Sequence, residues 1–207
     1  SPRRLKVIVK NFQHIMSRTV ILASKSPQRK NIMQAAGVEF KVVPADIDEQ
    51  AVVGVDPVKR AGMIAQKKAE AVQEKYPEAI IVAADTYIVL DGQVLEKPKD
   101  LEEAREMLAK QSGQVLTELT GFCYLDLKEN IQITKTAAVE VKFRQLSEAE
   151  IDHYITTQPV MTWSAAFCPA YDSGASLIKS INGSFTGFTH GLPLEELIPL
   201  LQQSKVL

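Results

Sequence analysis

A short segment near the start of the chain combines the residue types that bind an anion. The apolar stretch from Val20 to Ala23 predicts a strand, and Ser26 and Pro27 then suit the N-cap and first position of a helix. Free backbone N–H groups and the positive end of a helix dipole favour a phosphate at such a place. The surrounding hydroxyl and cationic side chains strengthen this prediction: Ser24, Ser26, Lys25, Arg29 and Lys30.

Two acidic motifs could supply carboxylates for catalysis or metal binding. Asp85 ends the apolar run Ala79–Ala84, which reads as a strand buried on both faces, where an unpaired charge is costly. Metal ligation or a general-base role would explain it, and so would a hydrogen-bonded carboxylate that holds a turn. Asp46-Ile47-Asp48-Glu49 follows another strand and is either a catalytic loop or a solvated turn. Glu96-Lys97-Pro98-Lys99 could clamp phosphates or form an ordinary charged turn.

The elements that must position these motifs alternate between strand and helix in the first half of the chain. Apolar spacing and capping residues predict helices at 27–36, 57–76, 100–111, 147–156 and 193–201. Strands are predicted at 20–23, 40–44, 79–84, 86–90, 94–95, 115–127, 131–143 and 176–181, with an irregular segment at 159–174. This order favours an α/β fold in which a mixed sheet carries helices on both sides.

Composition narrows the class of protein. The chain has 207 residues with 24 Lys and Arg against 25 Asp and Glu, but its first 38 residues hold eight basic residues and no acid. The remaining 16 basic and 25 acidic residues give the body a formal charge of −9, which suits a phosphate site completed by acidic metal ligands. No apolar run is long enough to cross a bilayer, and basic residues are not interleaved with aromatic ones as in nucleic-acid binding.

Cysteine and histidine usage argues against a zinc site or a disulfide framework. Cys123 and Cys168 are far apart, which favours core thiols in a reducing, cytoplasmic compartment, and the three histidines form no ligand pattern. Residues 1–18 are basic and lack acids. They are interpreted as an N-terminal extension, a tag-like segment or a transit signal, ahead of one domain over residues 19–207.

Eight short motifs in order resemble the Maf family of nucleoside triphosphate pyrophosphatases. The resemblance covers about residues 19–203 and rests on the segments Leu22-Ala23-Ser24-x-Ser26-Pro27-x-Arg29, Asp46-Ile47-Asp48-Glu49, Lys68-Ala69, Ala84-Asp85-Thr86, Asp91-Gly92 with Lys97-Pro98, Ser112-Gly113, Thr120-Gly121 and Gly191-Leu192-Pro193-Leu194. It implies a two-lobed Maf/ITPase-like fold with a deep cleft, a homodimer, and cleavage of a nucleotide between its α- and β-phosphates.

The resemblance also implies a role for each site residue. Asp85 would activate water and help ligate a metal, and Glu49 would be the second acidic residue of that metal site. Lys68 and Lys97 would grip the phosphates beside the phosphate-binding Ser24, Ser26 and Arg29. Hard oxygen ligands next to phosphates favour Mg²⁺, with Mn²⁺ as the alternative.

The sequence departs from the family mainly where the base would bind. Gln28 replaces the first of two consecutive arginines, and segment 162–171 lacks the Lys and Gln of members that hydrolyse dTTP and UTP. Segment 143–152 and Ala165-Ala166-Phe167 resemble the members that act on 7-methyl-GTP. Two functions therefore stand at this point: a pyrophosphatase for non-canonical or modified nucleotides, dTTP/UTP-like or 7-methyl-GTP-like, and a non-catalytic nucleotide-binding regulatory module.

Overall fold

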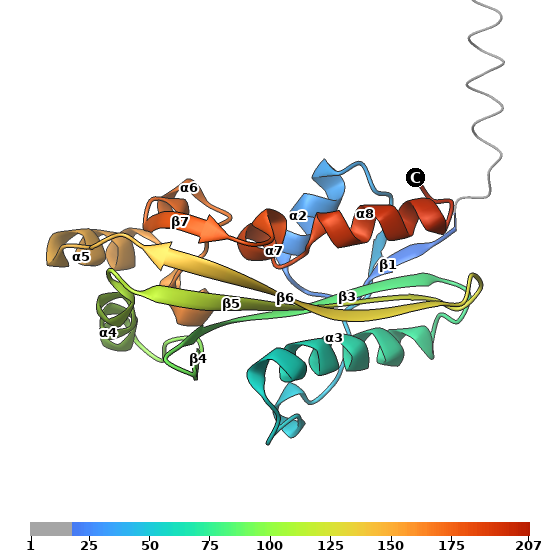
Figure 1. The fold of residues 1–207 in the computed structure, drawn as a ribbon, viewed down its shortest axis with the longest axis horizontal. Helices are drawn as coiled ribbons and strands as arrows, with labels where there is room; N and C mark the ends of the chain where they lie inside the picture. Colours follow the sequence, from blue (N-terminus) through green and yellow to red (C-terminus); the bar gives the residue numbers. More distant parts are fainter. Residues whose placement is uncertain (1–17) are drawn as a thin grey trace, which may run out of the picture.

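The computed structural model describes residues 18–207, so the predicted N-terminal segment 1–18 lies, apart from Arg18, outside the described residues. A long, mixed sheet runs the length of the molecule, and helices lie on both of its faces (Figure 1). The elements follow in the order β1 (Val20–Leu22), α2 (Pro27–Ala35), β2 (Lys41–Val42), η1 (Glu49–Ala51), α3 (Pro57–Gln73), β3 (Ile80–Leu90), β4 (Gln93–Leu95), α4 (Leu101–Gln111), β5 (Val115–Asp126), β6 (Ile131–Phe143), α5 (Glu148–Thr157), η2 (Val160–Thr162), η3 (Ser164–Ala166), α6 (Asp172–Ala175), β7 (Ile178–Asn182), α7 (Phe185–His190) and α8 (Leu194–Gln203).

The sheet has seven strands in the order β2-β1-β3-β5-β6-β7, with β4 added to β3. β1 is parallel to both β2 and β3, whereas the remaining pairs are antiparallel. The predicted mixed α/β sheet with flanking helices is therefore confirmed. The strand expected at 40–44 shrinks to the exposed pair Lys41–Val42.

The stretch predicted as two strands, 79–84 and 86–90, is one continuous strand of eleven residues. β3 pairs with β5 from Ile81 to Val89 without interruption, so Asp85 lies inside the ladder rather than at a strand tip. β5 and β6 match their predicted ranges closely and form a long hairpin. The short helix α7, which precedes the last helix, was not predicted.

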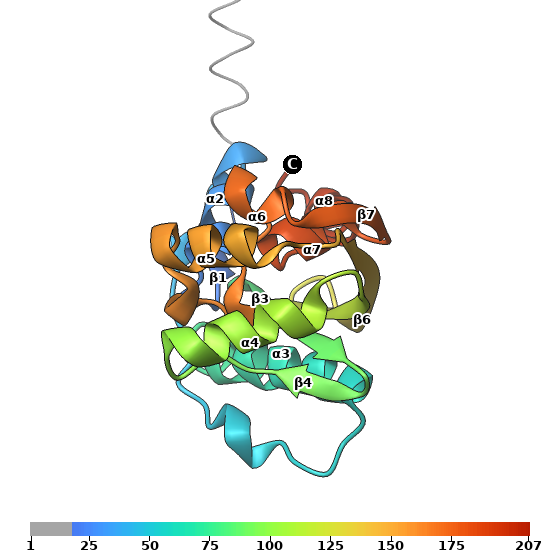
Figure 2. The ribbon, with the colours of Figure 1, turned by 90° about the vertical axis from the view of Figure 1, so that its left-hand side faces the viewer.

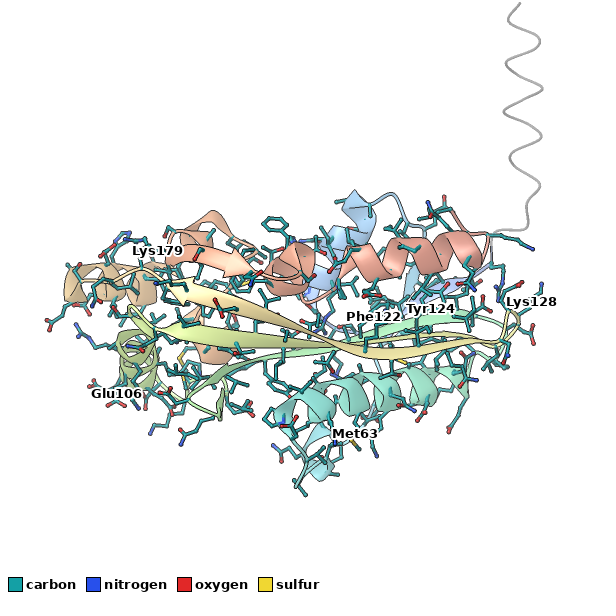
Figure 3. All side chains as sticks on the ribbon, in the orientation of Figure 1. Met63, Glu106, Phe122, Tyr124, Lys128 and Lys179 are labelled. Carbon is teal, nitrogen blue, oxygen red and sulfur yellow. The ribbon has the colours of Figure 1, made fainter. Side chains whose placement is uncertain are left out.

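Hydrophobic packing divides the sheet into two lobes. Toward one end, α3 covers one face and α2 and α8 cover the other, onto which Phe122 and Tyr124 project (Figure 3). Toward the other end lie α4 and α5 (Figure 2). Residues of both helices pack in a second core that includes Phe143, Phe167 and Phe188. The two-lobed architecture expected from the resemblance is present.

Helix α3 packs directly on the sheet because β5 has a glycine beneath it. A Cβ atom at Gly121 would lie 2.0 Å from the carbonyl oxygen of Ala61, so no larger residue fits without moving the helix. This contact fixes α3, and with it Lys68 in the next turns of the helix, against the strand that carries Asp85, which is paired with Gly121.

We predict that Gly121→Ala destabilises the protein by about 3 kcal/mol, because an added methyl group must push α3 away from β5. Urea unfolding checks this, with the exposed Thr117→Ser on the same strand as control, expected within about 0.5 kcal/mol of the parent. Equal unfolding midpoints for the two variants would contradict the close packing.

Candidate active site

The candidate site is a cleft at an interrupted edge of β3. β1 pairs with β3 along Ile80–Val82 and β4 pairs along Ile88–Leu90, so no strand covers the same edge between these two stretches. A cleft of about 1020 Å³ opens there. It is lined by all seven residues predicted for the site: Ser24, Ser26, Arg29, Glu49, Lys68, Asp85 and Lys97. Their catalytic and binding roles stay predictions.

The turn between β1 and α2 forms one wall of the cleft. Ser26 is the N-cap of α2, and its side chain accepts a hydrogen bond from the backbone N–H of Arg29. Ser24 Oγ accepts from the backbone N–H of Ser26 at 3.2 Å. The helix start thus meets the cleft at the carboxyl end of a parallel strand, where α/β folds commonly bind phosphates.

Arg29 is buried and joins three segments of the chain. Its guanidinium donates to Ser24 Oγ at 3.0 Å, to Thr86 Oγ1 at 3.0 Å and to the carbonyl oxygen of Gly191 at 2.8 Å. Burial lowers the pKa of Arg29, and the charge of Asp85 opposes that shift. Three of its five N–H donors are used by these acceptors, which leaves donors for a ligand anion.

Lys68 on α3 joins the two predicted acidic residues. Its ammonium lies 2.8 Å from Asp85 Oδ1 and 2.9 Å from Glu49 Oε1. The side chains of Lys68 and Asp85 are nearly buried, whereas that of Glu49 is half exposed. Two carboxylates share one ammonium, so the group keeps a net negative charge. Within residues 18–207, neither this site nor any other contains three or more His, Cys, Asp or Glu side chains placed to hold a metal ion.

Lys97 reaches the cleft from the exposed loop after β4. The carbonyl oxygen of Glu96 accepts a hydrogen bond from the N–H of Ala165 at 3.0 Å, which ties this loop to the segment predicted as irregular. That segment contains three short helical turns, and Ala165 and Ala166 both have positive φ angles, of 57° and 61°. Positive φ angles are unfavourable for alanine, so contacts with the rest of the protein, and not the intrinsic preference of these residues, set the backbone conformation here.

An aromatic and polar segment adjoins the start of α2. The rings of Trp163 and Tyr171 lie 5.5 Å apart between centroids and are tilted by 31°. Gln28 donates to the hydroxyl of Tyr171 at 3.4 Å and to Cys168 Sγ at 3.7 Å. Gln28 stands where the family pattern has an arginine, and it links α2 to segment 162–171, which also differs from that pattern. The two differences therefore lie in contact with each other.

Glu118 also lines the cleft, although no sequence motif indicated it. Glu118 is 1% exposed, and Thr120 Oγ1 donates to its Oε1 at 2.5 Å, while its Oε2 has no partner among the described residues. Burial raises the pKa of Glu118 to about 8, opposed by Thr120 and Arg29. The sequence does contain a pattern that indicates its burial. Because side chains alternate along β5, Glu118 lies on the same face of the strand as the apolar Leu116 and Phe122.

Comparison with solved structures defines the fold class. The Ham1 protein of Staphylococcus aureus superposes with a TM-score of 0.50 at 12% identity, covering 91% of this chain and 100% of that one. The Ham1 protein of Coxiella burnetii gives 0.50 at 14% identity, covering 90% and 99%. The chain therefore has an α/β fold of the Ham1 type.

Sequence comparison identifies the family within that fold. The chain belongs to the family described as Maf-like protein, whose profile matches residues 19–204. It is 34% identical over 187 residues to a dTTP/UTP pyrophosphatase of Ruminiclostridium cellulolyticum, covering 90% of this chain and 96% of the relative. A relative of the same name from Anaeromyxobacter dehalogenans is 36% identical over 194 residues, covering 91% and 95%.

The structure also bears on membrane association. Within residues 18–207, no helix has both the length and the apolar character needed to span a bilayer.

Glu118 makes stability depend on pH in a defined direction. Its folded pKa, about 8, lies above the ordinary 4.5, so the folded state holds the proton more tightly, and stability is lost as pH rises toward 8. We expect the free energy of unfolding to fall by about 1.6 kcal/mol in total between pH 6.5 and 8, relative to Glu118→Gln, with the slope levelling off as the pH approaches 8. His190, whose pKa is lowered by burial, acts equally in both proteins and cancels. Parallel curves for the two proteins in chemical denaturation would show that Glu118 is already ionised at pH 6.5.

Proposed function

We propose that this protein is a nucleoside triphosphate pyrophosphatase that hydrolyses dTTP and UTP to the monophosphate and pyrophosphate. The observation that carries the proposal is the nearly buried Asp85–Lys68 pair, which lies in the same cleft as the α2 start and Arg29. The carboxylate that would activate water and the cations that would bind phosphates thus line the same cleft. Curated relatives named dTTP/UTP pyrophosphatase align over most of the chain.

The reaction needs a base, and the proposal assigns this role to Asp85. Oδ1 of Asp85 accepts from Lys68, so Oδ2 is the oxygen that would take the proton of the attacking water. The water oxygen bonds to the α-phosphorus, and the bond from that phosphorus to the α–β bridging oxygen breaks. Pyrophosphate leaves with the bridging oxygen, so atoms and charge balance.

The cations of the cleft would hold the phosphates during this exchange. Lys68 has three N–H donors, of which Asp85 and Glu49 take two, so one remains for a phosphate oxygen. Arg29 and the N–H groups at the start of α2 would bind the phosphates from the opposite wall, and Lys97 would approach from its loop. Preorganised donors of this kind stabilise charge that develops in phosphoryl transfer.

A divalent cation fits the donors that are present. Mg²⁺ typically binds one or two carboxylates together with substrate phosphates and water, and Asp85 and Glu49 provide two carboxylates of net negative charge with Lys68. These two residues would hold Mg²⁺, or Mn²⁺ as the alternative. The bound cation would neutralise phosphate charge in the transition state.

The remaining parts of the proposal follow the family. Of the two substrates considered, the named relatives favour dTTP and UTP over 7-methyl-GTP. A homodimer is proposed from the resemblance alone, and a cytoplasmic location is proposed from the two free cysteines, which suit a reducing compartment. No stable nucleic-acid partner is proposed.

Light scattering coupled to size-exclusion chromatography would test the proposed homodimer. A monomer at micromolar concentration would refute it.

We predict that Asp85→Asn lowers kcat for dTTP by about a thousand-fold, because the amide cannot accept the proton of water. The assay measures monophosphate and pyrophosphate with Mg²⁺ present. Asp152→Asn changes a half-exposed carboxylate on α5, which pairs with Arg105 outside the cleft; it is the matched control and should keep full activity. Full activity in Asp85→Asn would remove Asp85 as the base. Nucleotide binding without turnover in the parent protein would favour the non-catalytic binding module.

Removing divalent cations with EDTA should abolish turnover, and adding Mg²⁺ back should restore it, since the carboxylates of Asp85 and Glu49 repel the phosphates unless a cation lies between them. We expect Glu49→Gln to raise the Mg²⁺ concentration needed for half-maximal rate several-fold, because one of two carboxylate ligands is lost. Exposed Glu140→Gln on β6 is the control. Undiminished hydrolysis in excess EDTA would refute a metal requirement.

A further inference from the structure

One carboxyl oxygen of Glu118, a residue that lines the cleft, has no hydrogen-bond partner among the described residues. The residue lies on β5 opposite Ile88, one step along the sheet from the cross-strand pair Thr86–Thr120. Oε2 of Glu118 is buried and lacks a hydrogen-bond partner among the described residues, although the residue lines the cleft. A buried, unsatisfied carboxyl oxygen costs stability unless a ligand satisfies it.

A chain of hydrogen bonds fixes where the proton of this carboxyl sits. Arg29 Nη2 donates to Thr86 Oγ1 at 3.0 Å, so the hydroxyl hydrogen of Thr86 is available for Thr120 Oγ1, 2.9 Å away. Thr120 in turn donates to Glu118 Oε1 at 2.5 Å, which is closer than its 3.3 Å contact with the Gly187 carbonyl oxygen. Because Oε1 accepts a hydrogen bond, the proton of the neutral acid is carried by Oε2.

Glu118 lies between the phosphate-binding Arg29 and an apolar part of the cleft. It shares the face of the sheet opposite to α3 with Thr86 and Thr120, and Arg29 donates a hydrogen bond to Thr86 on that face. Along that face the next residue of β5 is Leu116, which belongs to the core that contains Phe167 and Phe188. Both phenylalanines also line the cleft, together with Trp163. Glu118 thus stands where the polar end of the cleft meets its aromatic end.

We propose that Glu118 is a specificity-determining residue that donates a hydrogen bond from Oε2 to a carbonyl oxygen of the bound nucleobase. This inference rests on the proposed function, since it takes a pyrimidine nucleotide as the ligand. Uracil and thymine carry carbonyl oxygens that accept such a bond. The raised pKa of Glu118 keeps the carboxyl protonated at neutral pH, so it can donate without repelling the phosphates. The charged group that acts on it is Arg29, from α2.

The test measures binding by calorimetry with α,β-imido-dUTP, which cannot be hydrolysed, and with the corresponding α,β-imido triphosphate of deoxyribose that lacks a base. Glu118→Leu should raise the Kd for the nucleotide about tenfold, because the donor is lost, and leave the Kd for the abasic ligand unchanged. Glu118→Gln keeps an N–H donor of similar shape and should stay within about threefold of the parent. Glu140→Gln, on the exposed side of β6, controls for the amide change.

Three results would overturn the proposal, and they differ from failure of the proposed function. If Glu118→Leu and the parent bind the nucleotide equally, Glu118 contacts no ligand. If Glu118→Leu weakens both ligands alike, the contact is with sugar or phosphate and not with the base. If Glu118→Leu does not fold, Glu118→Gln decides: a tenfold loss in that isosteric variant refutes the donor role. A parent protein that binds no nucleotide refutes the proposed function along with this inference, whereas binding without hydrolysis refutes the function alone.

Discussion

The buried guanidinium of Arg29 is the interaction on which the cleft depends. Removing a cation from water is costly, and three acceptors compensate it here. They come from the β1–α2 turn, from β3 and from the segment between α7 and α8. Parts of the chain more than 160 residues apart are thereby held around one charge. Gly191 is required at this point, because a Cβ there would lie 2.7 Å from Thr86 Oγ1 and its φ is 64°.

The second constraint is the alternation of β3 at the open edge of the sheet. Neighbouring side chains of a strand point to opposite faces, so Asp85 joins Lys68 on the α3 face while Thr86 joins Arg29 on the other. A cleft that opened on one face would reach only one of these groups. Because this cleft opens at the strand edge between β1 and β4, it gives a ligand access to both sets of charges.

The second lobe supplies the wall that differs from the family pattern. Gln28 bonds to Tyr171 and Cys168, and Ala165 bonds to the loop that carries Lys97. The wall is therefore attached both to α2 and to the loop that carries Lys97. Gln28 and segment 162–171, the two places where the sequence departs from the pattern that the resemblance implies, are in direct contact.

The sequence alone determined the alternating elements, the mixed α/β class and the residues that bear charge near phosphates. It could do so because capping residues, apolar periodicity and turn residues act over a few positions. The sequence pattern predicted two strands in place of β3, because the polar Asp85 ends the apolar run. It gave no prediction for α7. Only the tertiary structure decided that Asp85 continues the ladder with β5, that Lys68 bridges Asp85 and Glu49, and that Glu118 enters the cleft. These outcomes depend on strand register and on contacts between distant segments, which local sequence patterns do not specify.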